Sequence, residues 1–357
     1  MTLYNKDRIV SADKVEIKDS FKDRYQYILG DQYDEYMKYS FTYLRKCIRV
    51  NTLKTTVEEL KNRLEEQEWV LTPIPWCPEG FFIEGHKTKH RFDIGNAIEH
   101  TLGYFYVQES ASMLPPVVLF SDKDEIDCTD FKVLDLCAAP GSKTTQIAMY
   151  MKNKGVLIAN DVDVGRLKPL TMNLQRMGVT NALVTMNAFQ KSKNSTKPRN
   201  PFLHFNSDNE LIPILDEEGN PKAFDRILVD APCSGTGTIR RSFKTLSMYS
   251  YGLVNRLVRI QKSLILHSFS MLKPGGIMVY STCTQEPLEN ENVISFLLEK
   301  CEDAEVLDIE LNINRQEAIE EFETMRYNPE VKKCLRIYPQ DNDSEGFFVA
   351  KIRKKLN

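Results

Sequence analysis

From residue 131 onward, the chain alternates short apolar runs with amphipathic segments in a regular β-α rhythm. The apolar runs are nearly continuous, as in strands that are buried on both faces. The segments between them space apolar residues three and four apart, for example Leu253, Leu257 and Ile260, as a helix with one buried face requires. This alternation predicts an α/β fold with a mostly parallel, doubly wound sheet. The expected strands are 132–136, 155–160, 181–186, 224–230 and 276–281.

The front of the chain predicts a small α/β domain. "KCIRVNTL", residues 46–53, alternates like a strand, and "EWVLTPIPW" reads as a second strand. Residues 54–67 lie between them and are expected to form a helix, because Thr55 and Glu58 have the spacing of a capping box. Residues 1–40 mix charged and aromatic side chains and are expected to be helical.

The remaining segments connect and close these regions. Residues 91–119 are expected to lead into a helix that Pro115-Pro116 disrupts. Residues 190–223, which are rich in Asn, Pro and Ser, predict a long surface loop. "KKCLRIYP" and "GFFVAKIRKK" predict a C-terminal β-hairpin that closes the main sheet. We therefore expect an N-terminal domain over residues 1–100 and a main domain over residues 101–357.

Composition narrows the class of protein. The 42% hydrophobic and 27% charged content is ordinary for a globular protein. No apolar run approaches the roughly 18 residues of a membrane span, and the start is too polar for a secretory signal. The eight cysteines include no CxxC pair, which argues against zinc and redox motifs, and their spread over a long chain argues against a disulfide scaffold. We expect a cytoplasmic monomer (nuclear, if the source is eukaryotic) with no metal and no membrane partner.

The charge distribution points to a phosphate-bearing partner despite a net charge of −3. No Asp or Glu occurs between Asp230 and Glu286, a stretch that carries seven Lys or Arg residues. A solvated helix face with few acids by chance is the alternative. A local positive surface suited to RNA is the sharper interpretation.

The turn after the first main strand has the character of a cofactor site. Ligands of open α/β sheets bind beyond the carboxyl ends of the strands. Small residues in "CAAPGSKT", 137–144, allow close backbone approach, and a helix begins directly after them. The spacing does not fit a P-loop, which needs G-x-x-x-x-G-K-[ST]. Asp161 ends the second strand, where a carboxylate can accept ribose hydroxyls or simply cap a helix.

Several motifs, in order along the chain, resemble the Nop/Sun family of RNA (cytosine-5) methyltransferases. They are "LDLCAAPGSKTTQIA", "ANDVDVGRL", "DRILVDAPCSGTGTIRR", "LKPGGIMVYSTCT" and "GFFVAKI", with "RVNTLK" and "YVQESASMLPP" at the front. The resemblance implies a Rossmann-like class I methyltransferase fold and S-adenosyl-L-methionine as cofactor. It implies a cofactor site formed by Cys137, Ala138, Ala139, Pro140, Gly141, Ser142, Lys143, Asp161, Arg166, Asn187 and Asp230. Asn187 stands where the family usually has Asp, and "QDNDSEGFF" lacks a His that relatives often carry nearby.

Two cysteines, Cys233 and Cys283, each follow an apolar strand. Methylation of carbon 5 of cytosine requires a thiol, and these two are the candidates. Carbon 5 of cytosine becomes nucleophilic when a thiolate adds to carbon 6. By the resemblance, Cys283 is the nucleophile and Cys233 assists product release. Asp230 is expected to hydrogen-bond the base, and Lys143 to lower a thiol pKa. The ordinary alternative for either thiol is a buried, inert cysteine.

The partner implied by the resemblance is RNA, and tRNA is preferred because the chain lacks long basic tails. Arg240, Arg241 and Lys244 are expected to grip phosphates, with Arg49 and Asn51 contacting the RNA backbone, unless "RVNT" merely joins a strand to a helix. Two other functions stay open: a non-catalytic RNA-binding assembly factor on the same fold, or rRNA as substrate. An amino-group methyltransferase is disfavoured, because Ala-Pro-Cys replaces the usual Pro-Pro-aromatic.

Overall fold

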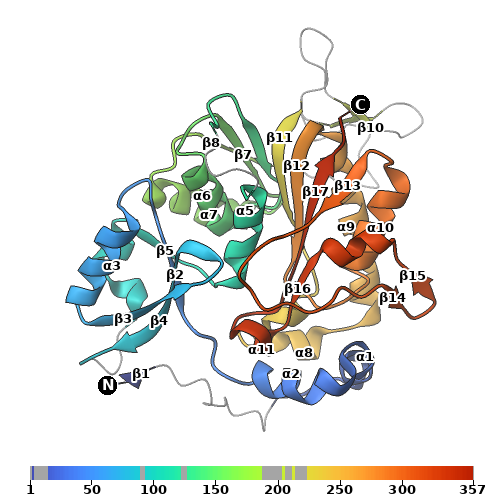
Figure 1. Ribbon diagram of the computed structural model, residues 1–357, viewed down its shortest axis with the longest axis horizontal. Helices are drawn as coiled ribbons and strands as arrows, with labels where there is room; N and C mark the ends of the chain where they lie inside the picture. Colours follow the sequence, from blue (N-terminus) through green and yellow to red (C-terminus); the bar gives the residue numbers. More distant parts are fainter. Residues whose placement is uncertain are drawn as a thin grey trace.

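The computed structural model describes residues 2–3, 15–88, 93–121, 127–186, 203–205, 211–213 and 223–356. A large sheet with helices on both faces forms the main body, and a smaller sheet lies beside it (Figure 1). Two N-terminal helices lie against the main body, away from the smaller sheet (Figure 1). The expected α/β fold with a small N-terminal domain is confirmed.

The main sheet has eight strands in the order β13-β17-β12-β11-β6-β7-β8, with β16 pairing β17. All five predicted strands are present and parallel: β6 (Lys132–Asp135), β7 (Val156–Asn160), β8 (Ala182–Thr185), β11 (Phe224–Asp230) and β12 (Leu272–Thr282). The predicted hairpin is β16 (Leu335–Ile337) with β17 (Phe347–Lys354). An unpredicted strand, β13 (Ala304–Leu307), completes the antiparallel edge.

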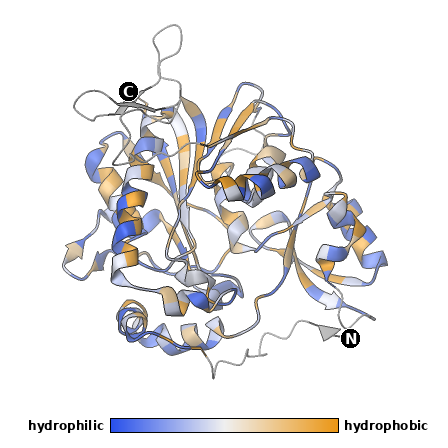
Figure 2. Cartoon of the chain, turned by 180° about the vertical axis from the view of Figure 1, so that it is seen from behind, coloured by the Kyte–Doolittle hydropathy of each residue, from blue (hydrophilic) through white to orange (hydrophobic). Residues whose placement is uncertain are grey.

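Alternate residues of the central strands pack on opposite faces, as strand geometry requires. Leu134, Val229 and Met278 contact the side of α9 (Tyr251–Ser270) and α10 (Glu291–Lys300). Val133, Leu228 and Val279 contact α5 (Leu114–Leu119) and α6 (Ser142–Tyr150). The apolar residues of both faces run through the middle of the molecule (Figure 2).

The prolines of α5 do not break the helix, contrary to prediction. Pro115 and Pro116 lie in its first turn, where the missing N–H is unpaired in any helix. The other predicted helix of the main domain is α7 (Val164–Met177), which packs Leu170 and Leu174 against the turn after β6. Shorter elements are α4 (Ile98–Thr101), α8 (Lys244–Met248), α11 (Pro339–Asn342), β14 (Glu321–Phe322) and β15 (Met325–Arg326).

The smaller sheet is antiparallel. Its strands are β1 (Thr2–Leu3), β2 (Cys47–Val50), β3 (Trp69–Ile74), β4 (Cys77–His86) and β5 (Phe105–Val107). The predicted helix is α3 (Val57–Glu66), but its capping box uses Thr56 and Glu59, one residue later than expected. Neither β4 nor β5 was predicted. Because β5 pairs with β2, this sheet extends beyond residue 100.

The expected N-terminal helices are α1 (Asp19–Leu29) and α2 (Tyr33–Ser40). They pack against the main domain, with Tyr25 and Tyr36 in one cluster with Tyr249 and Tyr338. The front of the chain is thus divided between two positions, helices on the main domain and a sheet beside it. Most of the predicted 190–223 loop lies outside the described residues, which there include only β9 (Leu203–Phe205), β10 (Leu211–Pro213) and residue 223.

Candidate active site

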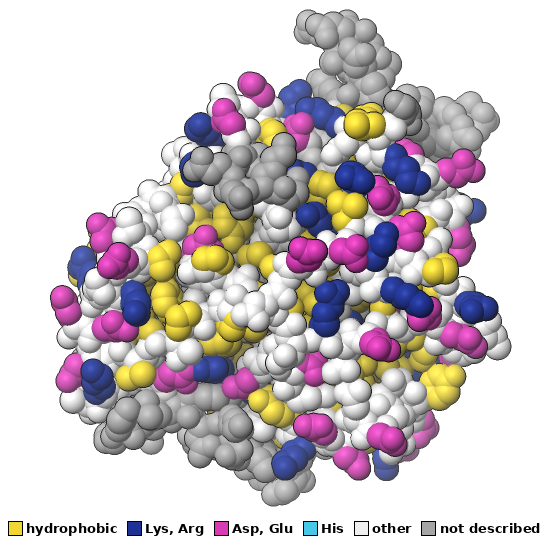
Figure 3. Space-filling view, viewed as in Figure 1, with side chains coloured by type: hydrophobic (Ala, Val, Ile, Leu, Met, Phe, Trp, Pro, Cys, Tyr) yellow, Lys and Arg dark blue, Asp and Glu magenta, His cyan; other side chains and the backbone are white. Residues whose placement is uncertain are grey.

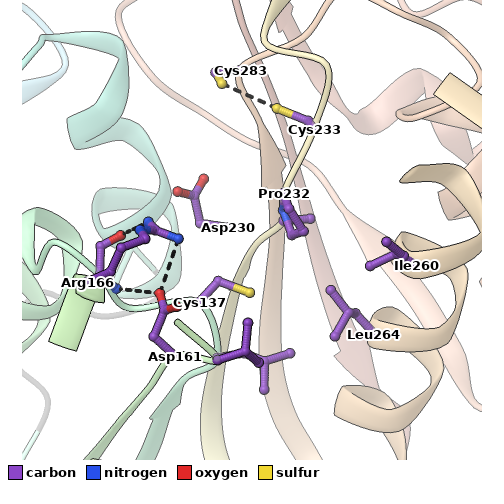
Figure 4. Close-up of a pocket in the computed structure, with 13 residues that line it drawn as sticks. Cys137, Asp161, Arg166, Asp230, Pro232, Cys233, Ile260, Leu264 and Cys283 are labelled. Atoms are coloured by element: carbon purple, nitrogen blue, oxygen red, sulfur yellow. Dashed lines mark hydrogen bonds and ion pairs between the residues drawn. The ribbon is translucent and has the colours of Figure 1, made fainter. Parts of the chain in front are cut away.

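The two predicted cysteines meet at one end of the main sheet. Parallel strands β11 and β12 are neighbours, with Asp230 opposite Ser281, so the loops that follow them emerge side by side. The Sγ atoms of Cys233 and Cys283 lie 3.2 Å apart, and both thiols are free (Figure 4). A pair of thiols at strand ends, where ligands of α/β sheets bind, is unlike an inert core cysteine.

The two thiols are not equivalent. The hydrogen bond to Cys283 and burial raise the pKa of Cys233 well above its usual range. Cys233 therefore keeps its proton, and in the contact between the two sulfurs either atom can be the donor. A thiol that keeps its proton is poorly suited to attack as a thiolate, which leaves Cys283 as the candidate nucleophile of the pair.

Asp230 and Lys143 form an ion pair beside the thiols. Lys143 Nζ lies 2.7 Å from Asp230 Oδ2, and Ser281 Oγ donates to Asp230 Oδ1 at 2.8 Å. Burial alone lowers the pKa of Lys143, but Asp230 outweighs it, and the pKa is raised. Both carboxylate oxygens of Asp230 therefore accept a hydrogen bond from a neighbouring side chain. Ser281 was not among the predicted site residues.

The turn between β6 and α6 is held by the acid that follows β7. Asp161, which is only 2% exposed, accepts from the backbone N–H of Ala139 at 3.0 Å. Arg166 lies 3.4 Å from the same carboxylate and donates to the carbonyl of Ala139. Gly141 has φ 104°, and a Cβ there would approach Leu170 to 3.0 Å, so glycine is required.

A cavity of about 430 Å³ joins this turn to the thiols. It is lined by Leu136, Cys137, Ala139, Asp161, Val162, Arg166, Asp230, Ala231, Pro232, Cys233, Ile260, Leu264 and Cys283 (Figure 4). The sequence analysis missed four apolar lining residues, because an apolar residue in a strand or helix is ordinarily interpreted as part of the hydrophobic core. They are Leu136, Val162, Ile260 and Leu264. Ala138, Pro140, Gly141 and Ser142 build the turn but do not line the cavity. Asn187 lies outside the described residues.

The cavity fits a ligand with both polar and apolar parts. Asp135, which directly precedes the lining residues Leu136 and Cys137, is buried, and its Oδ1 has no hydrogen-bond partner among the described residues. Burial raises the pKa of Asp135 to about 7, and burial also raises that of Cys137. Asp161 offers carboxylate oxygens in the lining of the cavity, and the apolar part of the lining can cover a ring.

Two of the residues predicted to contact RNA, Arg49 and Asn51, have buried side chains. Arg49 is fully buried and donates to the carbonyl of Ser142 at 2.7 Å and to Thr145 at 2.8 Å, so it ties the small sheet to α6. Asn51 is 1% exposed and donates to the carbonyls of Gly103 and Met177. The alternative interpretation of "RVNT", as a structural junction, describes them correctly.

The predicted phosphate-binding set is also reduced. Arg240 has no exposed side-chain surface and pairs with Asp343 at 2.8 Å, so it cannot grip RNA in this conformation. Arg241 is 61% exposed and lies 3.1 Å from Glu345, and Lys244 is exposed at the start of α8. Basic and acidic side chains are interspersed over the face seen in Figure 3.

No group of three His, Cys, Asp or Glu residues among the described residues could hold a metal ion. In the same part of the chain, every helix is too short or too polar to cross a membrane.

The parallel sheet, the turn after β6 and the acid after β7 define a class I S-adenosyl-L-methionine-dependent methyltransferase. Residues 125–353 match the family model of the 16S rRNA methyltransferase RsmB/F, and residues 17–110 match that of the N-terminal domain of 16S rRNA methyltransferase RsmF. The chain belongs to this family, the Nop/Sun family of RNA methyltransferases, and its cofactor is S-adenosyl-L-methionine.

Relatives with both kinds of RNA substrate in their names are similar to this chain. The tRNA (cytosine(49)-C(5))-methyltransferase of Pyrococcus abyssi is 43% identical, over 91% of this chain and 93% of that one. The ribosomal RNA small subunit methyltransferase F of Photobacterium profundum is 40% identical over 96% of this chain, which spans 64% of that protein. A crystal structure of a methyltransferase homolog protein from Pyrococcus horikoshii is 32% identical with a TM-score of 0.74, covering 96% of this chain and 97% of that one.

Proposed function

We propose that this protein transfers a methyl group from S-adenosyl-L-methionine to carbon 5 of a cytosine in RNA, through a transient bond between Cys283 and carbon 6. The observation that carries the proposal is the pair of thiols 3.2 Å apart, at the mouth of the cavity that also contains Asp161 and Arg166. Bound S-adenosyl-L-methionine supplies the electrophilic methyl carbon. Among the cavity residues, Asp161, Arg166, Cys137 and Ala139 are the candidates to hold it.

Cys283 activates the base. Carbon 5 of cytosine is a weak nucleophile, and addition of a thiolate to carbon 6 turns the ring into an enamine whose carbon 5 can attack. Because burial and the contact with Cys283 keep Cys233 protonated, Cys283 is the thiol of the pair to which we assign the new bond. A cytosine must be unpaired or flipped out of a duplex to reach this thiol.

Asp230 and Lys143 stabilise the charge that this addition creates. A carboxylate that accepts from Lys143 and Ser281 can also accept from the exocyclic amine of the ring. Lys143, protonated and 2.7 Å from Asp230, places a positive charge beside the ring as negative charge develops there. Cavity walls that exclude water make both interactions stronger.

Cys233 serves the release step. After methylation, the proton on carbon 5 leaves to a base, the carbon 5–carbon 6 double bond re-forms, and the bond from carbon 6 to the sulfur breaks. Cys233 keeps its proton next to that sulfur, so it can donate the proton to the departing thiolate.

We propose tRNA as the substrate. The supporting observation is the 43% identity with a tRNA methyltransferase over 93% of that enzyme. Ribosomal RNA is the second candidate, because both matching family models are those of 16S rRNA methyltransferases.

The mechanism is tested by methyl transfer from labelled cofactor and by trapping of the adduct. Cys283→Ser is expected to reduce transfer by about a thousandfold or more, and to abolish the denaturation-resistant complex with RNA that contains 5-azacytidine. Cys233→Ser is the matched control, since it should still form that complex. Normal methylation by Cys283→Ser would refute the adduct.

The substrate is tested separately. Bisulfite sequencing of total RNA from cells with and without this protein is expected to show one or more tRNA cytosines that lose methylation. Loss confined to rRNA positions would select the second candidate, and loss at neither would contradict both.

A further inference from the structure

Two consecutive residues, Glu289 and Asn290, hold the two thiol loops, one loop each. They lie between β12 and α10, and neither has exposed surface. They do not line the cavity, and the reaction described above does not use them. Their contacts are nevertheless directed at the immediate neighbours of Cys233 and Cys283.

Glu289 fixes the backbone around Cys233. Its Oε2 accepts from the backbone N–H of Ser234, the next residue, at 3.0 Å. The same oxygen accepts from Gln261 Nε2 at 2.8 Å, and Gln261 also donates to the carbonyl of Pro232 at 2.9 Å. The carboxyl group of Glu289 therefore holds Ser234, and the amide of Gln261, itself bonded to Glu289, holds Pro232.

Asn290 fixes the backbone around Cys283. Its Oδ1 accepts from the hydroxyl of Thr282 at 2.6 Å, and its Nδ2 donates to the carbonyl of Thr284 at 3.0 Å. Asn290 is the N-cap residue of α10, a position where Asn usually bonds the helix's own N–H groups. Here the side chain makes no capping hydrogen bond. Helix α10 therefore lacks a side-chain N-cap, and the side chain of Asn290 instead holds Thr282 and Thr284, the two residues that flank Cys283.

We propose that Glu289 and Asn290 are positioning residues of the methyl transfer reaction, Glu289 for Cys233 and Asn290 for Cys283. This inference rests on the proposed function, in which the two thiols serve different steps. Asn290 therefore governs formation of the adduct, and Glu289 governs its release. Their adjacency in the chain couples the two loops and sets the 3.2 Å between the sulfurs.

The experiment separates the two steps. Asn290→Leu is expected to slow formation of the complex with 5-azacytidine RNA by about tenfold to a hundredfold, the effect of a displacement near 1 Å. Glu289→Met is expected to form that complex at the wild-type rate. With ordinary RNA, however, Glu289→Met should accumulate a denaturation-resistant complex, as Cys233→Ser should. Glu289→Gln retains an oxygen for Ser234 and is expected to restore release.

A matched control is available on the same helix. Ser295 is 2% exposed and hydrogen-bonds Glu299 and Asn328, away from the thiols. Ser295→Ala is expected to keep both rates. The proposal is overturned if Asn290→Leu and Glu289→Met slow both steps in parallel, or if Glu289→Gln behaves like Glu289→Met.

A second readout does not depend on the proposed function. Diamide oxidises two thiols to a disulfide and takes up their two hydrogens, so the rate of Cys233–Cys283 bond formation reports the distance between the sulfurs. We expect this rate to change severalfold in Asn290→Leu and Glu289→Met, and to stay at the wild-type value in Ser295→Ala. If Cys233→Ser accumulates no adduct with ordinary RNA, the proposed role of Cys233 fails, and unchanged disulfide rates would overturn the positioning role.

Discussion

The two halves of the cavity are built in different ways. The cofactor half is local: Asp161 and Arg166 both hold Ala139, and all three lie within 28 consecutive residues, from the turn after β6 to the first turn of α7. The thiol half depends on side chains from distant parts of the chain. Its loops contact α1 near the N terminus, α9, the start of α10 and the C-terminal hairpin.

The contact with α1 is the longest in sequence. Arg24 donates to both oxygens of Glu286, at 3.1 and 2.6 Å, and both side chains are buried. Next to it, Tyr25 donates to Thr236, which contacts Thr284 at 2.8 Å. An N-terminal helix is thus part of the support of the catalytic loops, which explains why it packs on the main domain.

Because the two halves are supported by different parts of the chain, we expect them to respond differently to mutation. A change in α1 or α10 is expected to affect the thiols and to leave cofactor binding intact. A change near Asp161 is expected to do the opposite.

The largest effect is expected from Arg24→Met. The substitution leaves the carboxylate of Glu286 buried without its cation, which typically costs about 3–5 kcal/mol of unfolding free energy. Turnover should fall with it, whereas the Kd for S-adenosyl-L-methionine of the folded protein should not change. Urea unfolding and calorimetric titration measure the two quantities.

The matched control for Arg24 is Arg49→Met. Arg49 is equally buried but ties the small sheet to α6, beside the cofactor turn. The Arg49→Met substitution should lower the free energy of unfolding. It should also change the affinity for the cofactor more than it changes the rate of adduct formation. Equal loss of cofactor affinity in both variants would contradict the separation.

The next effect is that of Lys143→Met, at the junction of the halves. Removal of a charged donor from the reaction site is expected to lower turnover by about a hundredfold. The Kd for the cofactor should change by less than about threefold, because Lys143 faces Asp230 and the thiols. Steady-state kinetics measure turnover, and a direct binding measurement gives the Kd for the cofactor. Equal losses of turnover and of cofactor affinity would refute a catalytic role for Lys143.

The same contrast explains what the sequence could predict. The β-α rhythm, the cofactor turn and both cysteines are local patterns, and each was found at its correct strand end. The burial of Arg49, Asn51 and Arg240 was not predicted, because a sequence shows polarity and charge but not burial. Glu289 and Asn290 read as ordinary residues at the start of a helix, since their partners are defined only by the tertiary structure.

A smaller effect concerns pH, with one buried acid in each half. Burial raises the pKa of Asp135 and that of Glu289 to about 7. Carboxyl groups of the unfolded chain titrate near 4. The raised pKa therefore contributes stability that is complete below about pH 4 and is lost as the pH rises through about 7. The slope is at most about 1.4 kcal/mol per pH unit for each group.

Asp135→Asn and Glu289→Gln test this dependence. Each variant should lose less stability between pH 5 and 7 than the wild type does, as measured by urea unfolding at both pH values. In the double variant, the reductions in pH-dependent loss of unfolding free energy should add, because the two carboxyl groups belong to different halves. A steeper pH dependence in either single variant would contradict the sign.

The smallest effect is expected at the surface beside the thiol half. Arg241 and Lys244 are exposed there, whereas Arg240 is buried, so only the first two should contact phosphates. Arg241→Gln with Lys244→Gln should reduce the slope of log K against log salt by about 0.7 per lost contact with single-stranded RNA. Arg353, exposed at the opposite end of β17 from the site, is the control. Filter binding between about 50 and 200 mM salt measures the slope. An unchanged slope in the double variant would remove α8 from the RNA-binding surface, and would leave the thiol half without a basic edge of its own.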